Sequence, residues 1–407
     1  MKALCVLGRH NYGDVARGLG YEYVNFLPAL ERLGYETVVF ESLDRGAYRD
    51  FGELNAALLD TVERLRPELV LTVLLQYEVW TETLDLIRRN ASALLVNWAT
   101  DDSWKYAEFS RFLAPHFHAW ASTSPEACVR AARDGHGNFV LTQWAASADQ
   151  LTAPRAAAEC RYPVTFVGSA YGNRRRWVEE LSRRGIQVQC FGQGWPSGPV
   201  AAEAIPTIYR DSVVTLNFGD SGLHLQGLRP YRSRQIKARV FEVPGAGGCL
   251  LTQNAEHLSE FYVPDEEIMR FEDVDDLADK IRYCLEHPDE RDRIARAGHE
   301  RTRREHTYDL RFGRLLAQAR ALSDGAAGTQ SQRPSWPSFE EVSRGHRTGP
   351  VLQALRALLV LPARLLWGAR RGPRAARRLL FELSWRLLGA RTYSARGLPG
   401  RLFYRES

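Results

Sequence analysis

Basic and acidic side chains cluster in one short stretch of the chain: Arg232, Arg234, Lys237, Arg239 and Glu242. The stretch reads as a helix that begins near Ser233 and ends in a glycine turn containing Gly245 and Gly247. The first turn of a helix offers unpaired N–H groups and the positive end of its dipole, which favour an anion. We therefore predict that the basic residues bind a phosphate-bearing ligand and that Glu242 accepts hydrogen bonds from ribose hydroxyls. The alternative is a solvated surface helix with a glycine cap.

A second basic turn lies earlier in the chain. Gly168 ends the apolar run 163–168, and Arg174 and Arg175 follow at the start of a helix. Glycine allows a ligand to approach the backbone, and arginine can clamp a diphosphate with two parallel hydrogen bonds. Both arginines are therefore candidate donors to the same ligand. We interpret the acidic run 273–276 as a helix cap with first-turn charges, and we predict no metal site.

Three side chains are candidates for acid–base chemistry: His10, Asp101 and Asp102. The two aspartates follow the apolar run 93–98, where a carboxylate could take a proton from an acceptor hydroxyl. Asp102 could instead cap the helix that follows. His10 lies in a loop with Gly18 and Gly20, which are candidate ligand contacts because they permit close backbone approach. That loop is too long for a clean dinucleotide fingerprint.

Short apolar runs alternate with amphipathic stretches along most of the chain, in two series. The first series is 2–8, 37–41, 69–74, 93–98, 118–122 and 139–142, and the second is 163–168, 186–191, 213–218, 249–252 and 268–271. This alternation predicts parallel sheets covered by helices on both faces. We therefore predict an α/β fold of two Rossmann-like domains, 1–150 and 151–322, with a hinge at 143–160. The domains should face a cleft, because ligands bind at the carboxyl ends of parallel strands.

The charge of the chain is unevenly distributed. Residues 344–407 contain fourteen arginines, no lysine and two glutamates, a net charge of +12, whereas the whole chain carries only +5. Leucines and tryptophans are interleaved with these arginines, which is typical of amphipathic helices on an anionic bilayer surface. We predict a flexible linker at 323–343 and a basic amphipathic tail at 344–407, divided by Pro362 and Pro373. The alternative is that the leucines pack back on the body of the protein.

Other features of the sequence limit the possible functions. The six cysteines are scattered without metal-ligand spacing, as in a reduced cytoplasmic protein. The apolar run at the start is too short for a signal peptide. No eighteen apolar residues run together, so we expect no membrane span. We also expect no nucleic-acid partner, because the tail offers mainly leucine in place of stacking aromatic side chains.

The second domain resembles the nucleotide-sugar half of a GT-B glycosyltransferase, especially the group similar to the spore-maturation protein CgeB. The resemblance is carried by residues 239–248, 266–277 and 298–308. It implies that Glu242 binds the donor ribose and that the glycines after it pack near the donor. Similar enzymes have an acidic residue eight positions before this glutamate, and here that position is Arg234. The residue that would contact the hexose is therefore unassigned.

Together these features predict a metal-independent glycosyltransferase of the hexosyltransferase type, with a nucleoside-diphosphate sugar as donor and no tightly bound cofactor. The acceptor would be a sugar, a lipid-linked molecule or a protein. The tail would hold the enzyme at the inner, cytoplasmic face of a membrane. Two alternatives remain. One is an NAD-dependent oxidoreductase that uses Gly18, Gly20 and Glu41. The other is a non-catalytic membrane-associated scaffold, which the arginine at position 234 makes conceivable.

Overall fold

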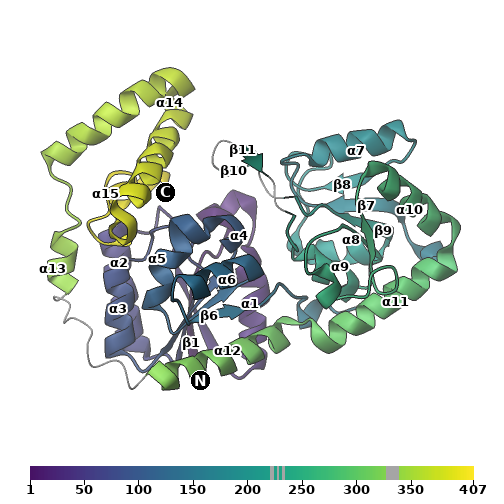
Figure 1. The fold of residues 1–407 in the computed structure, drawn as a ribbon, viewed down its shortest axis with the longest axis horizontal. Helices are drawn as coiled ribbons and strands as arrows, with labels where there is room; N and C mark the ends of the chain where they lie inside the picture. The colour runs from purple at the N-terminus through teal and green to yellow at the C-terminus, as the bar shows by residue number, and fades with distance from the viewer. Residues whose placement is uncertain (221–223, 227–228, 232–233, 327–338) are drawn as a thin grey trace. The chain divides into compact units, whose positions relative to one another are not determined.

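A computed structural model describes residues 1–220, 224–226, 229–231, 234–326 and 339–407 (Figure 1). The chain divides into two compact units. Residues 1–142 and 313–407 form the first unit, and residues 143–312 form the second. The residues of the predicted tail are therefore part of the first unit. The predicted linker is partly helical, because α12 (Tyr308–Ala326) extends to Ala326 and α13 (Phe339–Arg344) begins at Phe339.

The first unit is built on a parallel sheet of six strands in the order β2-β1-β3-β4-β5-β6. The strands are β1 (Lys2–Leu7), β2 (Glu36–Glu41), β3 (Leu69–Thr72), β4 (Leu94–Ala99), β5 (Ala119–Ser122) and β6 (Phe139–Leu141). Strands β3, β4 and β5 are buried along their whole length, which explains their continuous apolar sequences. The connecting helices are α1 (Tyr21–Arg32), α2 (Phe51–Leu65), α3 (Thr81–Asn90), α4 (Asp102–Lys105), α5 (Arg111–Leu113) and α6 (Pro125–Arg133).

The second unit repeats this architecture with five parallel strands in the order β13-β12-β9-β7-β8. The strands are β7 (Tyr162–Val167), β8 (Gln189–Phe191), β9 (Ser212–Asn217), β12 (Leu250–Gln253) and β13 (Met269–Phe271). Its helices are α7 (Arg174–Arg183), α8 (Ile205–Arg210), α9 (Arg239–Gly245), α10 (Val274–Glu286) and α11 (Pro288–Glu305), and α12 begins within it. A short hairpin of β10 (His224–Gln226) and β11 (Arg229–Tyr231) precedes α9. Asp273 caps α10 by accepting from the backbone N–H groups of Asp275 and Asp276, as predicted.

The arginine-rich segment forms a helical hairpin and a compact end. Helix α14 (Pro350–Leu388) is broken at Gly368, whose φ of 77° and ψ of 172° lie outside the helical region. Its two arms touch where a Cβ on Gly372 would lie only 2.6 Å from Arg364 Cα, so this position requires glycine. A 3-10 turn (Gly389–Tyr393) and α15 (Leu398–Leu402) follow. The break is therefore at Gly368, whereas Pro362 and Pro373 both lie within helical arms.

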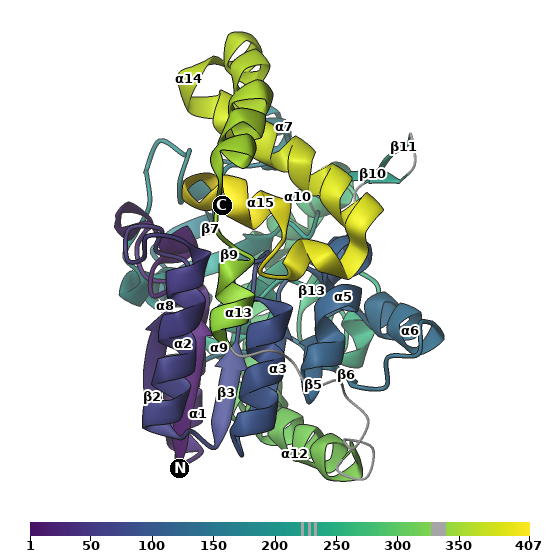
Figure 2. The same ribbon diagram turned by 90° about the vertical axis from the view of Figure 1, so that its left-hand side faces the viewer.

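Aromatic side chains anchor this segment in the core of the first unit. Phe381, Tyr393 and Tyr404 belong to the same buried cluster as Phe51 and Trp80. The ring centroids of Phe51 and Tyr404 are 4.8 Å apart in an edge-to-face arrangement. Figures 1 and 2 show α15 beside the ends of α2 and α3. The alternative that the tail packs back on the body is thus correct for its second half.

The outer surface of α14 remains apolar. Val351, Leu358, Leu361 and Leu365 follow helical spacing on the first arm and are 63–81% exposed. By length and composition, one helical segment of the described chain could cross a membrane: within 350–393, an 18-residue window has a mean hydropathy of 1.4 and is 11% buried. The sequence expectation of no membrane span counted only unbroken apolar runs, whereas this window includes isolated arginines; the expectation stays a prediction.

Candidate functional site

Two arginines converge at the carboxyl end of β7 in the second unit. Arg174, the first residue of α7, and Arg239, the first residue of α9, both lie over the ring of Phe166, at 5.3 and 5.4 Å from its centroid. A Cβ on Gly168 would lie 3.0 Å from Arg239 Nη1 and 3.5 Å from Arg174 Nη1. The structure therefore brings together three residues that the sequence singled out separately.

Neutral groups hold both guanidinium groups in place. Arg174 Nη1 donates to the carbonyl oxygen of Ser169 at 2.9 Å, and its guanidinium lies 4.0 Å from the ring centroid of Tyr171. Arg239 Nε donates to Asn217 Oδ1 at 3.0 Å. Within the described residues, neither arginine forms an ion pair with an acidic side chain. Two like charges are thus fixed side by side, and the charge of Asp220 acts on Arg174 only from beyond ion-pair distance. This arrangement suits a dianionic ligand.

The electrostatics of this pair support the same conclusion. Burial, and next the charge of Arg239, lower the pKa of Arg174 to about 10. Arg174 is only 4% exposed, yet it remains a cation at neutral pH. A bound anion would relieve the repulsion between the two guanidinium groups, and this repulsion is an electrostatic driving force for binding.

Arg175, the second residue of α7, contacts the loop after β8. Its guanidinium donates to the carbonyl oxygen of Gly194 and lies 5.4 Å from the ring centroid of Trp195. Trp195 Nε1 in turn donates to the carbonyl oxygen of Gly168 at 2.7 Å. Arg175 and Trp195 therefore border the arginine pair on the β8 side, and Arg175 stabilises the loop.

Polar residues that follow the neighbouring strands complete this edge of the sheet. Gln253 Oε1 accepts from the backbone N–H groups of Gly219 at 3.0 Å and Asp220 at 3.2 Å. Asn217 Nδ2 donates to Thr252 Oγ1 at 2.9 Å, which orients its Oδ1 toward Arg239. Sequence analysis did not assign Asn217 and Gln253 to the site. Their position at the ends of β9 and β12 was the available signal.

The stretch around Glu242 differs from the prediction in one respect. Helix α9 begins at Arg239, and the described residues just before it are not helical, so a helix beginning near Ser233 was wrong. Arg234 instead joins an isolated bridge to Asp220 and forms an ion pair with Glu272 at 2.9 Å. Arg234 is therefore already paired with a carboxylate.

Lys237 and Glu242 are both half-buried. Lys237 Nζ donates to Gln235 Oε1. Glu242 lies one helical turn after Arg239 on α9, and its charge, after burial, raises the pKa of Tyr209. Glu242 is thus placed next to the arginine site along the chain. Arg232 and Ser233 lie outside the described residues.

Gly245 and Gly247, which the sequence predicted as donor contacts, pack closely against an earlier segment of the chain. A Cβ on Gly245 would lie 2.6 Å from Ala146 Cβ, and one on Gly247 would lie 2.6 Å from the carbonyl oxygen of Thr152. Both glycines therefore permit close packing of α9 and the following turn against residues 146–154. This packing gives both glycines a structural role, and their contact with a donor stays a prediction.

In the first unit, the two candidate aspartates have different environments. Asp102 is 2% exposed, and its carboxylate accepts from Ser110 Oγ and, at 3.0 Å, from Trp120 Nε1. Burial raises the pKa of Asp102. Both oxygens of Asp102 are engaged inside the unit, which favours a structural role, and its catalytic role stays a prediction. Asp101 is 38% exposed at its side chain and pairs with Lys105 Nζ at 3.5 Å, so it remains a candidate base.

Glu22, in the first turn of α1, is a candidate that the sequence analysis missed. Burial raises the pKa of Glu22, and the negative charge of Asp101 adds to this effect. The two carboxyl groups therefore lie close enough to interact at the carboxyl end of the first sheet. Such a pair can divide into one ionised and one protonated member.

The loop after β1 does not form a dinucleotide site. Glu41 Oε1 accepts from the backbone N–H groups of Leu43 at 2.8 Å and Asp44 at 3.1 Å, and its Oε2 accepts from that of Arg9 at 2.7 Å. This carboxylate is occupied by backbone N–H groups of the loops after β1 and β2, which removes the acid that ribose binding would need. A Cβ on Gly20 would lie 2.7 Å from the carbonyl oxygen of Gly8, so its role is loop closure.

The same loop contains two other candidate residues, His10 and Gly18. His10 is half-exposed and forms an isolated backbone bridge with Leu19. Gly18 has a φ of 77° and no atom within 4 Å of its notional Cβ, so it remains open to solvent or a ligand.

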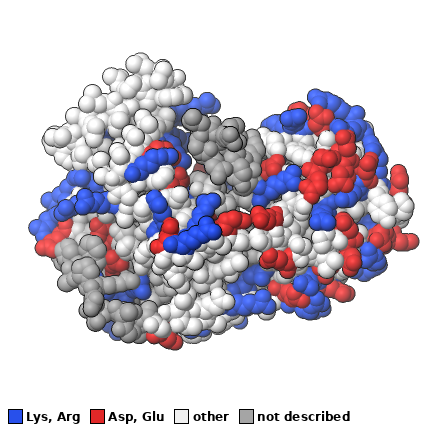
Figure 3. All heavy atoms as spheres, in the orientation of Figure 1, with Lys and Arg blue, Asp and Glu red and all other residues white. Residues whose placement is uncertain are grey.

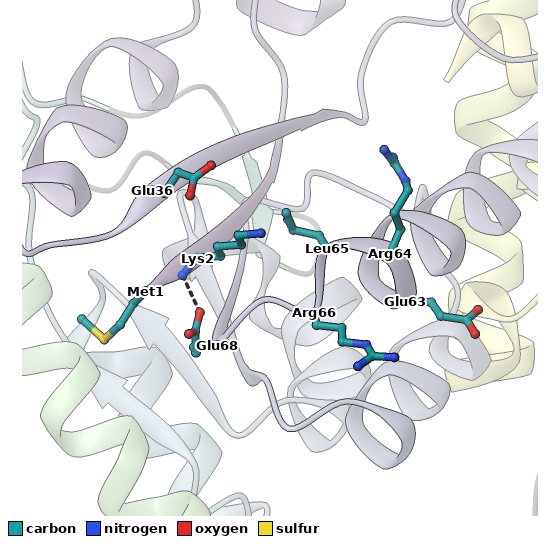
Figure 4. A pocket seen from close by; sticks show the side chains of 8 residues that line it. All are labelled: Met1, Lys2, Glu36, Glu63, Arg64, Leu65, Arg66 and Glu68. Atoms are coloured by element: carbon teal, nitrogen blue, oxygen red, sulfur yellow. Dashed lines mark hydrogen bonds between the residues drawn. The ribbon is translucent and has the colours of Figure 1, made fainter.

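One open pocket of about 740 Å³ lies at the opposite, amino end of the first sheet (Figure 4). It is lined by Lys2, Glu36, Arg66 and Glu68, near the starts of β1, β2 and β3. The Lys2 backbone N–H donates to Glu68, which lowers the pKa of that carboxyl group. Ligands of parallel sheets bind at the carboxyl ends of strands, so this pocket is not part of the candidate site.

Comparisons with known proteins agree with this architecture. Residues 174–317, about a third of the chain, match the family described as glycosyl transferase-like. No curated protein matches the sequence. The fold is that of the GT-B glycosyltransferases, with two Rossmann-like units and an additional long helix near the carboxyl terminus.

Three solved structures illustrate the likeness. Sucrose-phosphate synthase from Thermosynechococcus elongatus aligns with a TM-score of 0.56 at 13% identity, over 79% of this chain and 100% of that chain. A glycosyltransferase from Rickettsia africae aligns with a TM-score of 0.53 at 12% identity, over 79% and 98% of the two chains. HepE from Anabaena in complex with UDP-glucose aligns with a TM-score of 0.51 at 12% identity, over 81% and 100%.

Proposed function

We propose that the protein is a glycosyltransferase that takes a sugar from a nucleoside-diphosphate donor. The convergence of Arg174 and Arg239 at Gly168 carries this proposal, because it places two cations, with no ion-pair partner in the described part of the chain, at the carboxyl end of a Rossmann-like sheet. The match of residues 174–317 to a glycosyl transferase-like family covers the same edge. HepE, which shares the fold, binds UDP-glucose, so a uridine-diphosphate sugar is the first donor to test.

In this proposal the two arginines bind the diphosphate of the donor. Negative charge accumulates on that diphosphate as the glycosidic bond breaks, and preorganised guanidinium groups stabilise it without reorganisation. Arginine supplies this stabilisation in the role that a metal ion has in other transferases. Glu242 accepts hydrogen bonds from the ribose, and Asp101 in the first unit takes the proton from the acceptor hydroxyl.

We further propose that the hairpin of α14 attaches the enzyme to an anionic membrane surface. Leu361, Leu365 and Trp367 are 55–81% exposed near its tip. Arg364, Arg370, Arg371 and Arg374 are exposed in the same region and form no ion pair with a described residue. Figure 3 shows that the region of α14 is largely uncharged between its basic residues. This combination suits insertion between lipid headgroups, with the arginines near phosphate groups.

The donor site can be tested by measuring UDP affinity calorimetrically. Arg239→Gln removes one charge-assisted contact, which is worth about 1.5–3 kcal/mol, and UDP should therefore bind roughly ten- to 100-fold more weakly. Arg183→Gln is the matched control, because Arg183 lies on the exposed face of α7 and pairs only with Glu180. Absence of UDP and GDP binding to the unmodified chain, or equal UDP affinity in both variants, would refute the assignment.

A further inference from the structure

The end of the chain lies on the loops that follow β2 and β3 in the first unit. Tyr77 and Ser407 share a hydrogen bond of 2.8 Å between Tyr77 Oη and Ser407 Oγ. Arg45 Nε donates to the backbone oxygen of Ser407 at 3.2 Å, and its guanidinium lies 5.6 Å from the ring centroid of Tyr404. These loops form the carboxyl end of the sheet. The segment that carries the exposed hairpin is therefore fixed to the same end of the first unit as Asp101.

A short chain of contacts connects Asp101 with the second arm of α14. Lys105 Nζ lies 3.5 Å from Asp101 Oδ2 and donates to the carbonyl oxygen of Leu75 at 3.3 Å. The next residue, Gln76, accepts from Arg377 Nη1 through its Oε1. Lys105 and Arg377 thus contact adjacent residues of one loop, Leu75 and Gln76. Through this loop the candidate base is connected with the hairpin.

Both cations have donor capacity that the described protein does not use. Arg377 Nε is buried and has no hydrogen-bond partner among the described residues. The side chain of Lys105 is 15% exposed, and it has three N–H donors for one carbonyl and one carboxylate. An anionic oxygen close to Gln76 would be attracted by both the Lys105 ammonium and the Arg377 guanidinium. A phosphate group has the required number of acceptor oxygens.

The exposed surface of the hairpin indicates which kind of molecule would carry that phosphate. Its two arms meet at Gly372, and its inner face packs through Val360, Ala363 and Ala376 against Phe403. The apolar outer stripe of the first arm is left exposed, as are the arginines around Gly368. A molecule with a lipid chain and a phosphate headgroup matches both the stripe and the two cations, whereas a free phosphate matches only the cations.

We propose that the acceptor is a phosphate-bearing membrane lipid whose headgroup binds between Lys105 and Arg377. This inference rests on the proposed transferase function. The lipid chain remains in the bilayer beside the first arm of α14, and the headgroup extends from the phosphate site toward Asp101. The hydroxyl that receives the sugar is on that headgroup. Glycosyl transfer then forms a bond between the anomeric carbon and this oxygen, releases the nucleoside diphosphate and passes the hydroxyl proton to Asp101.

The test measures hydrogen–deuterium exchange of the full chain with phosphatidylcholine vesicles that contain phosphatidic acid. We expect slower exchange at residues 73–80 and 100–106 with these vesicles, but no change with pure phosphatidylcholine vesicles or inorganic phosphate. Arg377→Ala should abolish the protection, whereas Arg391→Ala, which removes an exposed arginine of the same segment, should preserve it.

Three outcomes would overturn the inference: no protection with any vesicle, equal protection by inorganic phosphate, or protection that persists in Arg377→Ala. UDP binding to the second unit is measured in the same samples. Loss of UDP binding with intact lipid protection would refute the transferase function and leave the lipid site in place. Intact UDP binding without lipid protection would refute the lipid acceptor alone.

Discussion

Single side chains in the second unit owe their roles to position as much as to type. Arg174 and Arg239 approach each other at Gly168 and form no ion pair with a described carboxylate, whereas Arg234, which has the same chemistry, is paired with Glu272. Residue type and spacing could identify all three as candidate phosphate ligands. They could not tell which would meet, because Glu272 is 38 residues away from Arg234 in the sequence. Likewise, the burial of Asp102 depends on Ser110 and Trp120, which sequence spacing does not connect to it.

His306 allows a prediction of pH dependence at the residue scale. It is 4% exposed, and burial lowers its pKa to about 4 from an ordinary value of 6.5. Its Nε2 contacts the carbonyl oxygen of Phe261 at 2.8 Å, and its Nδ1 contacts Arg311 Nη2 at 3.1 Å. Protonation would place an N–H against a guanidinium. The unfolded chain binds a proton below pH 6.5 that the folded chain rejects, so folding is stabilised above pH 6.5 and this contribution is lost as the pH falls toward 4.

The expected contribution is about 3 kcal/mol. Urea unfolding of the full chain, followed by hydrogen exchange at β9 and β12, should show a free energy of unfolding that falls from pH 7 to pH 4.5. His306→Gln should have a flatter pH profile, and His287→Gln, an exposed position, should retain the steep one. Identical profiles for all three proteins would contradict this origin of the pH dependence.

At the scale of elements, the turn after α9 is defined by steric contact with residues 146–154. Gly247 has a φ of 81°, and its notional Cβ would clash with the carbonyl oxygen of Thr152. The sequence identified a glycine turn here, yet the resemblance assigned it to the donor. The packing explanation depends on the approach of a segment about a hundred residues earlier, which a local pattern does not contain.

We therefore expect Gly247→Ala to destabilise the second unit, because alanine adds both backbone strain and a clash. The cost should be about 1–3 kcal/mol, measured as a shift in the urea midpoint of exchange at β12. UDP affinity at low denaturant should remain unchanged. Gly185→Ala is a suitable control, since its φ of 80° is similar but no atom lies within 4 Å of its Cβ. A large loss of UDP affinity in Gly247→Ala would restore the glycine turn as a donor contact.

The strands were the most predictable elements. All eleven predicted apolar runs overlap strands, because buried parallel strands are mostly apolar and polar loops interrupt them. The start of α9 was less predictable. Residues 234–238 have a helix-compatible composition, but the bridge between Asp220 and Arg234 holds the backbone extended. A tertiary contact thus overrides local propensity there.

At the scale of the whole molecule, the two arms of α14 have different surroundings. The second arm is fixed by Phe381 and Tyr393, whereas the first arm presents leucines outward. Composition alone predicted an amphipathic helix but not which half would be covered. The residues that cover the second arm lie about 300 positions away, on α2 and α3 and the loop before α3. A local sequence pattern therefore cannot predict them.

Membrane attachment should depend on the outer stripe of the first arm. The double variant Leu361→Glu and Leu365→Glu loses apolar burial worth about 1.5–3 kcal/mol per leucine and introduces charge repulsion from anionic lipids. Co-sedimentation with vesicles of phosphatidylglycerol and phosphatidylcholine should therefore fall at least about 100-fold in partition coefficient. Raising the salt concentration should weaken binding of the unmodified protein.

Leu141→Glu is the matched control, because Leu141 is also exposed, at 52%, but lies on β6 away from the hairpin. Its partition coefficient should match that of the unmodified chain. Equal binding of the double variant and this control would exclude the stripe as the attachment surface.

The first unit is built from two separate segments of the chain, which affects how a newly made chain can fold. Residues 1–142 leave the ribosome first, but the buried cluster of Phe51, Tyr77 and Trp80 is completed by residues 339–407, which are made last. The intervening second unit is contiguous and can mature during translation. The earlier-made part must therefore wait, with apolar side chains exposed, until synthesis has passed through its neighbour. We therefore expect chaperones to bind mainly to residues 1–142 during synthesis.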